Sequence, residues 1–256
     1  NINKIFLDAF VQEKTSTGFR YPGVNNAINN QVNRGALIVN YTGHGGPSGL
    51  AHEQVVTTRD ILSWSNSNML PLFMTATCEF SRYDEYDRAL DQEATSAGEE
   101  VILSTVGGGI ALFTTTRLVY SGPNHRLNEK FFEVVFEKDS TGANYRLGDI
   151  IRYSKNNTTD GYNKRNFTLL GDPSIRLLYP GNRVITDSIN SYPVPLTEDT
   201  LSAFDWVSVS GHLESEAGVL LEDFQGTVLP VVFDKEKKVE TLANDNGRIF
   251  EFKTRS

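Results

Sequence analysis

The chain has 256 residues with 32 acidic and 24 basic side chains, which gives a formal net charge of −8. No basic run is longer than Lys237 and Lys238, so neither nucleic acid nor an anionic membrane surface is an expected partner. Hydrophobic residues make up 39% of the chain, enough for a sizeable core. No apolar stretch reaches the roughly 18 residues that a transmembrane helix needs.

Strand and helix patterns alternate through residue 178, which predicts an α/β fold with a mostly parallel sheet flanked by helices. Apolar runs predict core strands at residues 4–10, 36–42, 71–77, 101–106 and 174–178. Between them, apolar side chains at helical spacing predict helices. These are marked by Val24, Ile28 and Val32 before Gly35, by residues 59–64 after a cap at Thr57 or Thr58, by Ala89 and Leu90 up to Gly98, by Leu127 and Phe131, and by Leu147 and Ile150.

Two of the predicted strands end in loops that carry reactive side chains. His44, flanked by glycines, follows the strand at residues 36–42, and Cys78, the only cysteine of the chain, follows the strand at residues 71–77. Open α/β sheets bind ligands at the carboxyl ends of their strands, and strands joined by one crossover can lie about 5 Å apart. The two side chains are therefore expected to meet, and an imidazole beside a thiol can take its proton to leave a nucleophilic thiolate.

A plainer interpretation of the same residues stays open. A lone cysteine such as Cys78 is most often a small buried hydrophobe. His52 and Glu53 could suggest a metal site or a carboxylate that orients a histidine, but no metal-binding spacing accompanies them. Structural or rim roles are the alternative for that pair, and no metal site is predicted.

After Pro180 the apolar pattern changes to period two, which predicts a small all-β domain of the immunoglobulin-like sandwich type. Asn246 and Gly247 are expected to form a hairpin turn in it. Residues 181–200 are rich in turn-forming residues and are predicted to be a linker. The expected organisation is a first domain at residues 1–180, the linker, and a partial β-sandwich at residues 201–256.

Four motifs taken together resemble the gingipain-type cysteine peptidases, a family with a caspase-like fold. The motifs are residues 40–46 (NYTGHGG), 70–81 (LPLFMTATCEFS), 107–117 (GGGIALFTTTR) and 170–174 (LGDPS), in the family's order. The resemblance implies a caspase-like peptidase domain over residues 1–180. It also implies that Cys78 is the nucleophile, that His44 is its proton acceptor, and that the backbone amides of Gly45 and Cys78 form the oxyanion site.

The resemblance also suggests residues that contact the substrate. In the family, the segment that matches Thr115, Thr116 and Arg117 borders the specificity pocket, and Glu79 directly follows the nucleophile. The alternatives for these residues are a helix start with a surface arginine and a solvated loop. The orientation of Glu79 matters, because a carboxylate pointing at Cys78 would disfavour the thiolate.

Within the family, the motifs resemble most a surface sortase of the type IX secretion system. This implies a cysteine endopeptidase or transpeptidase that removes the C-terminal signal domain of secreted cargo and links the cargo to surface lipopolysaccharide. It also implies a place at the bacterial outer membrane, beside other surface components of that system. Two alternatives are a catalytically inactive caspase-like scaffold that binds partners and a secreted endopeptidase of broad specificity. No cofactor is expected, although an irregular calcium site would leave no sequence signature.

The sequence pattern at both ends predicts that the chain is cut from a longer one. The first eight residues already form a predicted strand and lack an initial Met, and residues 250–256 still have a strand-like pattern. A caspase-like sheet has six strands, and five are predicted here. An upstream strand, with any catalytic residue that it carries, is therefore expected to precede residue 1.

Overall fold

A computed structural model describes residues 2–87, 92–194, 201–202, 204–228, 230–244 and 247–254. The chain divides into two compact units. Unit 1 comprises Asn1–Leu177 together with Asp234–Ser256, and unit 2 comprises Leu178–Phe233. The first unit carries the predicted catalytic residues.

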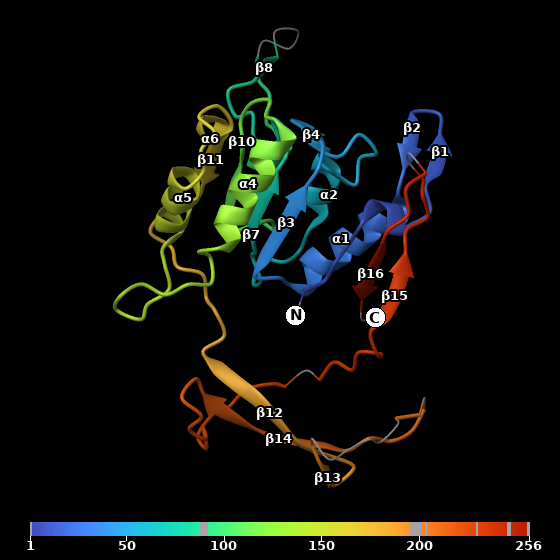
Figure 1. The fold of residues 1–256 in the computed structure, drawn as a ribbon, viewed down its shortest axis with the longest axis vertical. Coiled ribbons are helices and arrows are strands. Elements are labelled where there is room, and N and C mark those ends of the chain that lie inside the picture. Colours follow the sequence, from blue (N-terminus) through green and yellow to red (C-terminus); the bar gives the residue numbers. More distant parts are fainter. Residues whose placement is uncertain are drawn as a thin grey trace. The chain divides into compact units, whose positions relative to one another are not determined.

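A four-stranded sheet forms the centre of unit 1, in the order β11-β10-β7-β3 (Figure 1). Strands β3 (Ile38–Thr42), β7 (Leu72–Ala76) and β10 (Ala111–Thr115) are parallel, and β11 (Phe167–Leu170) is antiparallel at the edge. All residues of β7 and β10 are buried, as expected for strands covered on both faces. The prediction of a mostly parallel sheet is confirmed.

Helices cover both faces of this sheet. On one face, Phe73 and Leu112 join a core with α1 (Pro22–Arg34), α2 (Thr58–Ser63) and α3 (Ala97–Leu103). On the other face, the ring of Phe113 contacts Phe131 of α4 (Ser121–Phe132), and α5 (Leu147–Asn156) packs against α4. Figure 1 shows α4 lying across the sheet. The alternation of neighbouring side chains along β7 and β10 therefore builds two cores.

The helices before and after β3 form for local reasons that the sequence shows. Helix α1 begins with Pro22 and ends at Gly35, whose φ of 95° lies in the region that favours glycine. Helix α2 begins with a capping box, in which the side chain of Thr57 accepts from the Asp60 amide and the Asp60 carboxylate accepts from the Thr57 amide. Helix α2 lies in the connection from β3 to β7, which pair in parallel.

The remaining elements of unit 1 are short. A small sheet of β4 (Gly45–Gly46), β5 (Gly49–Leu50) and β6 (Val56–Thr57) follows β3 directly. The others are the 3-10 helix η1 (Leu7–Ala9), β1 (Glu13–Thr15), β2 (Gly18–Arg20), β8 (Tyr86–Asp87), β9 (Gln92–Glu93), α6 (Asn163–Asn166), β15 (Lys237–Glu240) and β16 (Glu251–Thr254).

Three of the predicted core strands are wrong. Residues 4–10 contain the 3-10 turn η1, closed by the Phe10 amide on the Leu7 carbonyl. Residues 101–106 begin inside α3, because a capping box at Ser96 starts a helix three residues after Glu93. An apolar run this short does not distinguish a strand from a buried helix turn.

The third error concerns the edge of the sheet. Residues 174–178 make only an isolated bridge, between Arg176 and Arg146, and the edge strand is β11. The predicted helix that ends at Gly98 is also wrong, because α3 begins at Ala97; Ala89 and Leu90 lie outside the described residues.

The predicted linker and C-terminal domain differ from the structure. Residues 182–189 form the eight-residue strand β12 (Asn182–Ile189), because they pair with β14 (Val209–Ser215). With β13 (Tyr192–Pro193) they make one three-stranded antiparallel sheet, and the described part of unit 2 contains no second sheet. Residues 195–200, the rest of the predicted linker, are outside the described residues.

The last segment of the chain returns to unit 1 and does not belong to a separate C-terminal domain. Asp8 anchors it: its carbonyl accepts from the Leu242 amide at 2.7 Å, and its carboxylate accepts from the amides of Ala243 and Asn244. The ring of Phe6 also packs edge-on against Phe252. Strands β15 and β16 pair as predicted for a hairpin, but Asn246 of the predicted turn lies outside the described residues.

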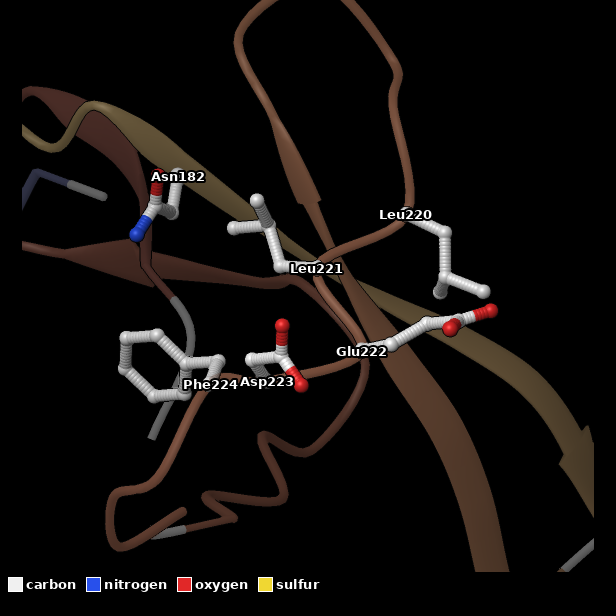
Figure 2. A pocket seen from close by; sticks show the side chains of 6 residues that line it. All are labelled: Asn182, Leu220, Leu221, Glu222, Asp223 and Phe224. Atoms are coloured by element: carbon white, nitrogen blue, oxygen red, sulfur yellow. The ribbon is translucent and has the colours of Figure 1, made fainter.

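Unit 2 has one open hollow, shown in Figure 2. Its lining comes from the start of β12 and from the loop after β14 and consists of Asn182, Leu220, Leu221, Glu222, Asp223 and Phe224. None of these residues was predicted to be catalytic. The residues that were predicted to be catalytic, His44 and Cys78, follow β3 and β7 in unit 1.

Candidate active site

The pairing of β3 with β7 sets the positions of His44 and Cys78. The strands are in parallel register with Thr42 opposite Ala76, and the Gly43 amide donates to the Ala76 carbonyl at 3.4 Å just beyond the last pair. His44 and Cys78 each lie two residues past that pair. Because paired strands run about 4.8 Å apart, the two residues occupy matching places on neighbouring loops.

These two loops meet where the backbone of Gly45 lies against the side chain of Thr77. A methyl group on Gly45 would overlap the hydroxyl of Thr77 and lie 3.2 Å from its Cγ2. Thr77 is buried, and its carbonyl accepts a hydrogen bond from the Thr115 hydroxyl at 2.6 Å. The residue after His44 therefore packs on the residue before Cys78, and only glycine leaves room for that contact.

The backbone of His44 is fixed by two hydrogen bonds. Its carbonyl accepts from the Ala51 amide at 2.8 Å and from the Tyr41 hydroxyl at 2.7 Å. Burial raises the pKa of Tyr41 well above its usual range, and the nearby Glu53 carboxylate raises it further, so the hydroxyl remains a donor. The His44 ring is exposed and stacks on the ring of His52.

Cys78 is half-buried and is not hydrogen-bonded to His44. Its Sγ donates to the carbonyl of Val119 at 3.5 Å, and the described residues show no bond between the thiol and an imidazole. Glu79, the next residue, has a φ of 50°, an unusual value for a residue with a side chain. The Glu79 amide donates to the Arg117 carbonyl at 3.3 Å. These bonds hold the loop that carries Cys78 against the segment after β10.

Two backbone N–H groups near the thiol lack backbone acceptors. The Cys78 amide donates to no acceptor within the described part of the chain. The direction of the Gly45 N–H follows from the antiparallel pairing of β4 with β5, in which hydrogen-bonded and non-bonded residue pairs alternate. The preceding pair is hydrogen-bonded, because the His44 carbonyl accepts from the Ala51 amide. Gly45 therefore belongs to a non-bonded pair, and its N–H points away from β5. Both groups predicted to form the oxyanion site are available to an added acceptor.

The four predicted substrate contacts lie in two segments, Glu79 directly after Cys78 and residues 115–117, which bond to the neighbours of Cys78. Each already has an interaction within the protein. Thr115 is fully buried, and the Thr116 hydroxyl donates to the Asn166 carbonyl at 3.3 Å. The Glu79 carboxylate is bonded to Arg82 at 3.3 Å. Arg117 has the clearest partner, the carboxylate of Asp84, with one bond at 2.8 Å and a second, shorter one.

The ion pair between Arg117 and Asp84 bridges the loops that follow β10 and β7. Hydrogen bonding from Arg117 keeps the pKa of the Asp84 carboxyl below its ordinary value, and the same bond raises the pKa of Arg117. Asp84 was not among the predicted site residues, because nothing local in the sequence links it to an arginine 33 positions away.

Neither a metal centre nor a membrane helix is found where the structure describes the chain. Among the described residues, no group of three or more His, Cys, Asp or Glu side chains could hold a metal ion. None of the described helices has the length and apolar character of a membrane span.

Tyr41, Thr77 and Val119 are site residues that the sequence reasoning missed, although the first two lie inside the motifs that carry His44 and Cys78.

Comparison with known proteins identifies the family. The profile of peptidase family C25 matches residues 1–178. The chain belongs to peptidase family C25. Its fold is similar to the crystal structure of the Arg specific cysteine proteinase gingipain R (RGPB), with a TM-score of 0.52 and 22% identity over 63% of this chain and 39% of that chain. The Porphyromonas gingivalis RgpB pro- and mature-domain complex gives a TM-score of 0.51 and 19% identity over 63% and 40%.

A third structure shares sequence with this C25 chain but is not similar enough for a comparison of folds. Dimeric latent PorU from Porphyromonas gingivalis is 25% identical over 85% of this chain and 19% of that chain, with a TM-score of 0.29. The C25 chain thus spans 39% of the gingipain R chain and 19% of the PorU chain. No curated protein matches it.

Proposed function

We propose that this chain is a cysteine peptidase that cleaves peptide bonds by acyl transfer, with Cys78 as the nucleophile and His44 as its proton carrier. The observation that carries the proposal is the parallel register of β3 and β7, which gives His44 and Cys78 matching positions at the carboxyl end of the sheet. Membership of peptidase family C25 supports it. The available amides of Gly45 and Cys78 supply the third component, hydrogen-bond donors for an oxyanion.

The reaction begins when the thiol leaves the Val119 carbonyl and turns to His44. The imidazole takes the thiol proton, the sulfur bonds to the substrate carbonyl carbon, and the C=O electron pair moves onto oxygen. The N–H groups of Gly45 and Cys78 bind that oxyanion. The C–N bond then breaks as the imidazolium of His44 gives its proton to the leaving amine, which leaves a thioester on Cys78.

The thioester can be resolved in two ways. Attack by water gives a carboxylic acid and returns the thiol, which is hydrolysis. Attack by an amine gives a new amide, which is transpeptidation. In both cases His44 accepts the proton of the attacking group and returns it to the sulfur, so the enzyme ends the cycle unchanged.

For the substrate, we propose the C-terminal signal domain of cargo secreted by the type IX system, with transfer of the cargo to surface lipopolysaccharide. The support is the resemblance of residues 40–46 and 70–81 to PorU, the surface sortase of that system. Other surface components of that system would then be neighbours at the bacterial outer membrane. The proposed substrate contacts are Glu79, Thr115, Thr116 and Arg117. Glu79 directly follows Cys78, and the segment 115–117 is bonded to the residues on either side of Cys78.

The test replaces Cys78→Ala and His44→Ala separately in the bacterium that makes the protein. Both changes should leave secreted cargo with its C-terminal domain attached, while Gly46→Ala, where a methyl group meets open space, should not. Normal processing in the Cys78→Ala strain would contradict the sortase role. If the purified wild-type protein also failed to cleave unfolded casein, the chain would be an inactive scaffold; if it cleaved casein, it would be an endopeptidase of broader specificity.

A further inference from the structure

We infer that His52 is a positioning residue for His44, and this inference rests on the proposed role of His44 in proton transfer. The imidazole rings of His44 and His52 lie with their centroids 4.8 Å apart and their planes at 20° to each other. This is a stack of two flat rings, and neither family membership nor the sequence motifs assigned His52 a role. A parallel ring against one face of an imidazole limits how that imidazole can rotate.

The His44 side chain needs such a restraint. Its carbonyl is held by Tyr41 and Ala51, but these bonds fix the backbone and leave the side-chain torsions free. Both rings are exposed, so core packing does not hold them. Within the described residues, the His44 ring contacts the ring of His52. A proton carrier must keep its nitrogen within reach of the thiol, and a free ring would spend less time there.

The turn that carries His52 has a defined shape. It connects β5 to β6, and its ends are buried at Leu50 and Val55, joined by the Val55 amide on the Leu50 carbonyl at 3.0 Å. On either side of His52 and Glu53, Ala51 and Gln54 have φ values of 60° and 56°. Residues with side chains avoid this region unless the surrounding structure imposes it. The turn therefore presents the His52 ring to His44 from a fixed backbone.

Alkylation of Cys78 by iodoacetamide near neutral pH is the direct test, because it measures thiolate supply without requiring a known substrate. His52→Ala should slow the reaction about three- to tenfold, the range that the loss of one aromatic stack produces. His52→Phe keeps a flat ring without the imidazole nitrogens and should return the rate to within about twofold of the wild type. Gln54→Ala is the matched control, an exposed side chain of the same turn, and should change nothing.

Three outcomes would overturn the inference: an unchanged rate in His52→Ala, no rescue by His52→Phe, or an equal loss in Gln54→Ala, which would point to the shape of the turn. His44→Ala separates these failures from failure of the proposed function. If His44→Ala slows alkylation and His52→Ala does not, only the role of His52 is wrong. If His44→Ala has no effect, the proposed proton transfer itself is wrong.

Discussion

Gly45 packs directly on Thr77, so the residue after His44 touches the residue before Cys78. The backbone of Gly45 lies against the side chain of Thr77, and this close approach depends on the absence of a side chain at position 45. This contact lies just beyond the last pair of β3 and β7, Thr42 with Ala76.

The first prediction follows from this contact. In Gly45→Ala, the new methyl group meets the buried Thr77, so we expect a loss of stability of about 1–3 kcal/mol and a loss of peptidase activity of at least about tenfold. The neighbouring Gly46→Ala is the control, because its methyl group would meet nothing within 4 Å. It should change stability by less than about 0.5 kcal/mol. Thermal unfolding and turnover measured on both variants check this, and equal effects would show that the contact is unimportant.

A second prediction concerns the glycine-rich segment before β10. Asn66 is buried, and its amide bonds both backbone groups of Gly108: Oδ1 accepts from the Gly108 N–H at 2.9 Å, and Nδ2 donates to the Gly108 carbonyl at 3.0 Å. Asn66→Ala would leave these groups buried without partners, which should cost about 2–4 kcal/mol in unfolding free energy. Asn68→Ala, an exposed position in the same loop, is the control. Urea denaturation measures both, and a loss below about 1 kcal/mol in Asn66→Ala would contradict the account.

The third prediction decides what Arg117 does. If its role is to hold the loops together through Asp84, then Arg117→Ala, Asp84→Ala and the double variant should lower activity by the same factor. If Arg117 binds substrate directly, Arg117→Ala should lower activity while Asp84→Ala leaves it close to that of the wild type. A double-mutant cycle on turnover distinguishes the two. The proposed role of Arg117 as a substrate contact predicts the second result, and the first would show that Arg117 acts only through Asp84.

The same ion pair has a defined pH dependence. The pKa of Asp84 is lowered in the folded protein, so its contribution is present above the unfolded value of about 3.9 and is lost as pH falls through the lower folded value. A carbon-detected NMR titration should therefore find the Asp84 carboxyl still ionised at about pH 4. In Arg117→Ala its pKa should move back up. An ordinary Asp84 titration in the wild type would show that the ion pair does not form in solution.

A fourth prediction concerns unit 2. His212 of β14 lies between two carboxylates, with Nδ1 at 2.8 Å from Asp187 and Nε2 at 3.0 Å from Glu214. The bonds to Asp187 and then to Glu214 raise its pKa. The stabilisation is complete below the unfolded value of about 6.5 and is lost as pH rises through the higher folded value. Proton NMR should find His212 still protonated at about pH 6.5, whereas Asp187→Asn should lower its pKa; an ordinary titration would contradict the pairing.

The sequence predicted the strands that precede His44 and Cys78 because their signals are local. The strands before His44 and Cys78 are apolar runs bounded by turns, and α2 between them has a complete capping box at Thr57. The prediction of a strand at residues 101–106 was wrong because three apolar residues fit a buried helix turn equally well. The prediction that the last residues belong to a separate domain was wrong because their attachment to Asp8 joins positions more than 230 residues apart.

The positions of the candidate site residues in the chain were also predictable from local signals, but their side-chain contacts were not. His44 and Cys78 stand at strand ends that a pattern can locate, and Gly45 lies in a glycine-rich motif. The bond from Cys78 to the Val119 carbonyl was not predictable, because any residue at position 119 has a carbonyl. The stack of His52 on His44 depends on the shape of the turn at residues 51–54. The positive φ values in this turn were not predictable, because they occur at residues other than glycine.

Whether His44 activates Cys78 can be measured as the rate at which iodoacetamide alkylates Cys78 at about pH 7, with the modified residue located by peptide mass spectrometry. We predict that the folded wild-type protein reacts roughly ten times faster or more than the same protein unfolded in urea. We also predict that His44→Ala lowers the folded rate to that of the unfolded thiol. A folded wild-type rate no higher than the unfolded one, and unchanged by His44→Ala, would contradict the account.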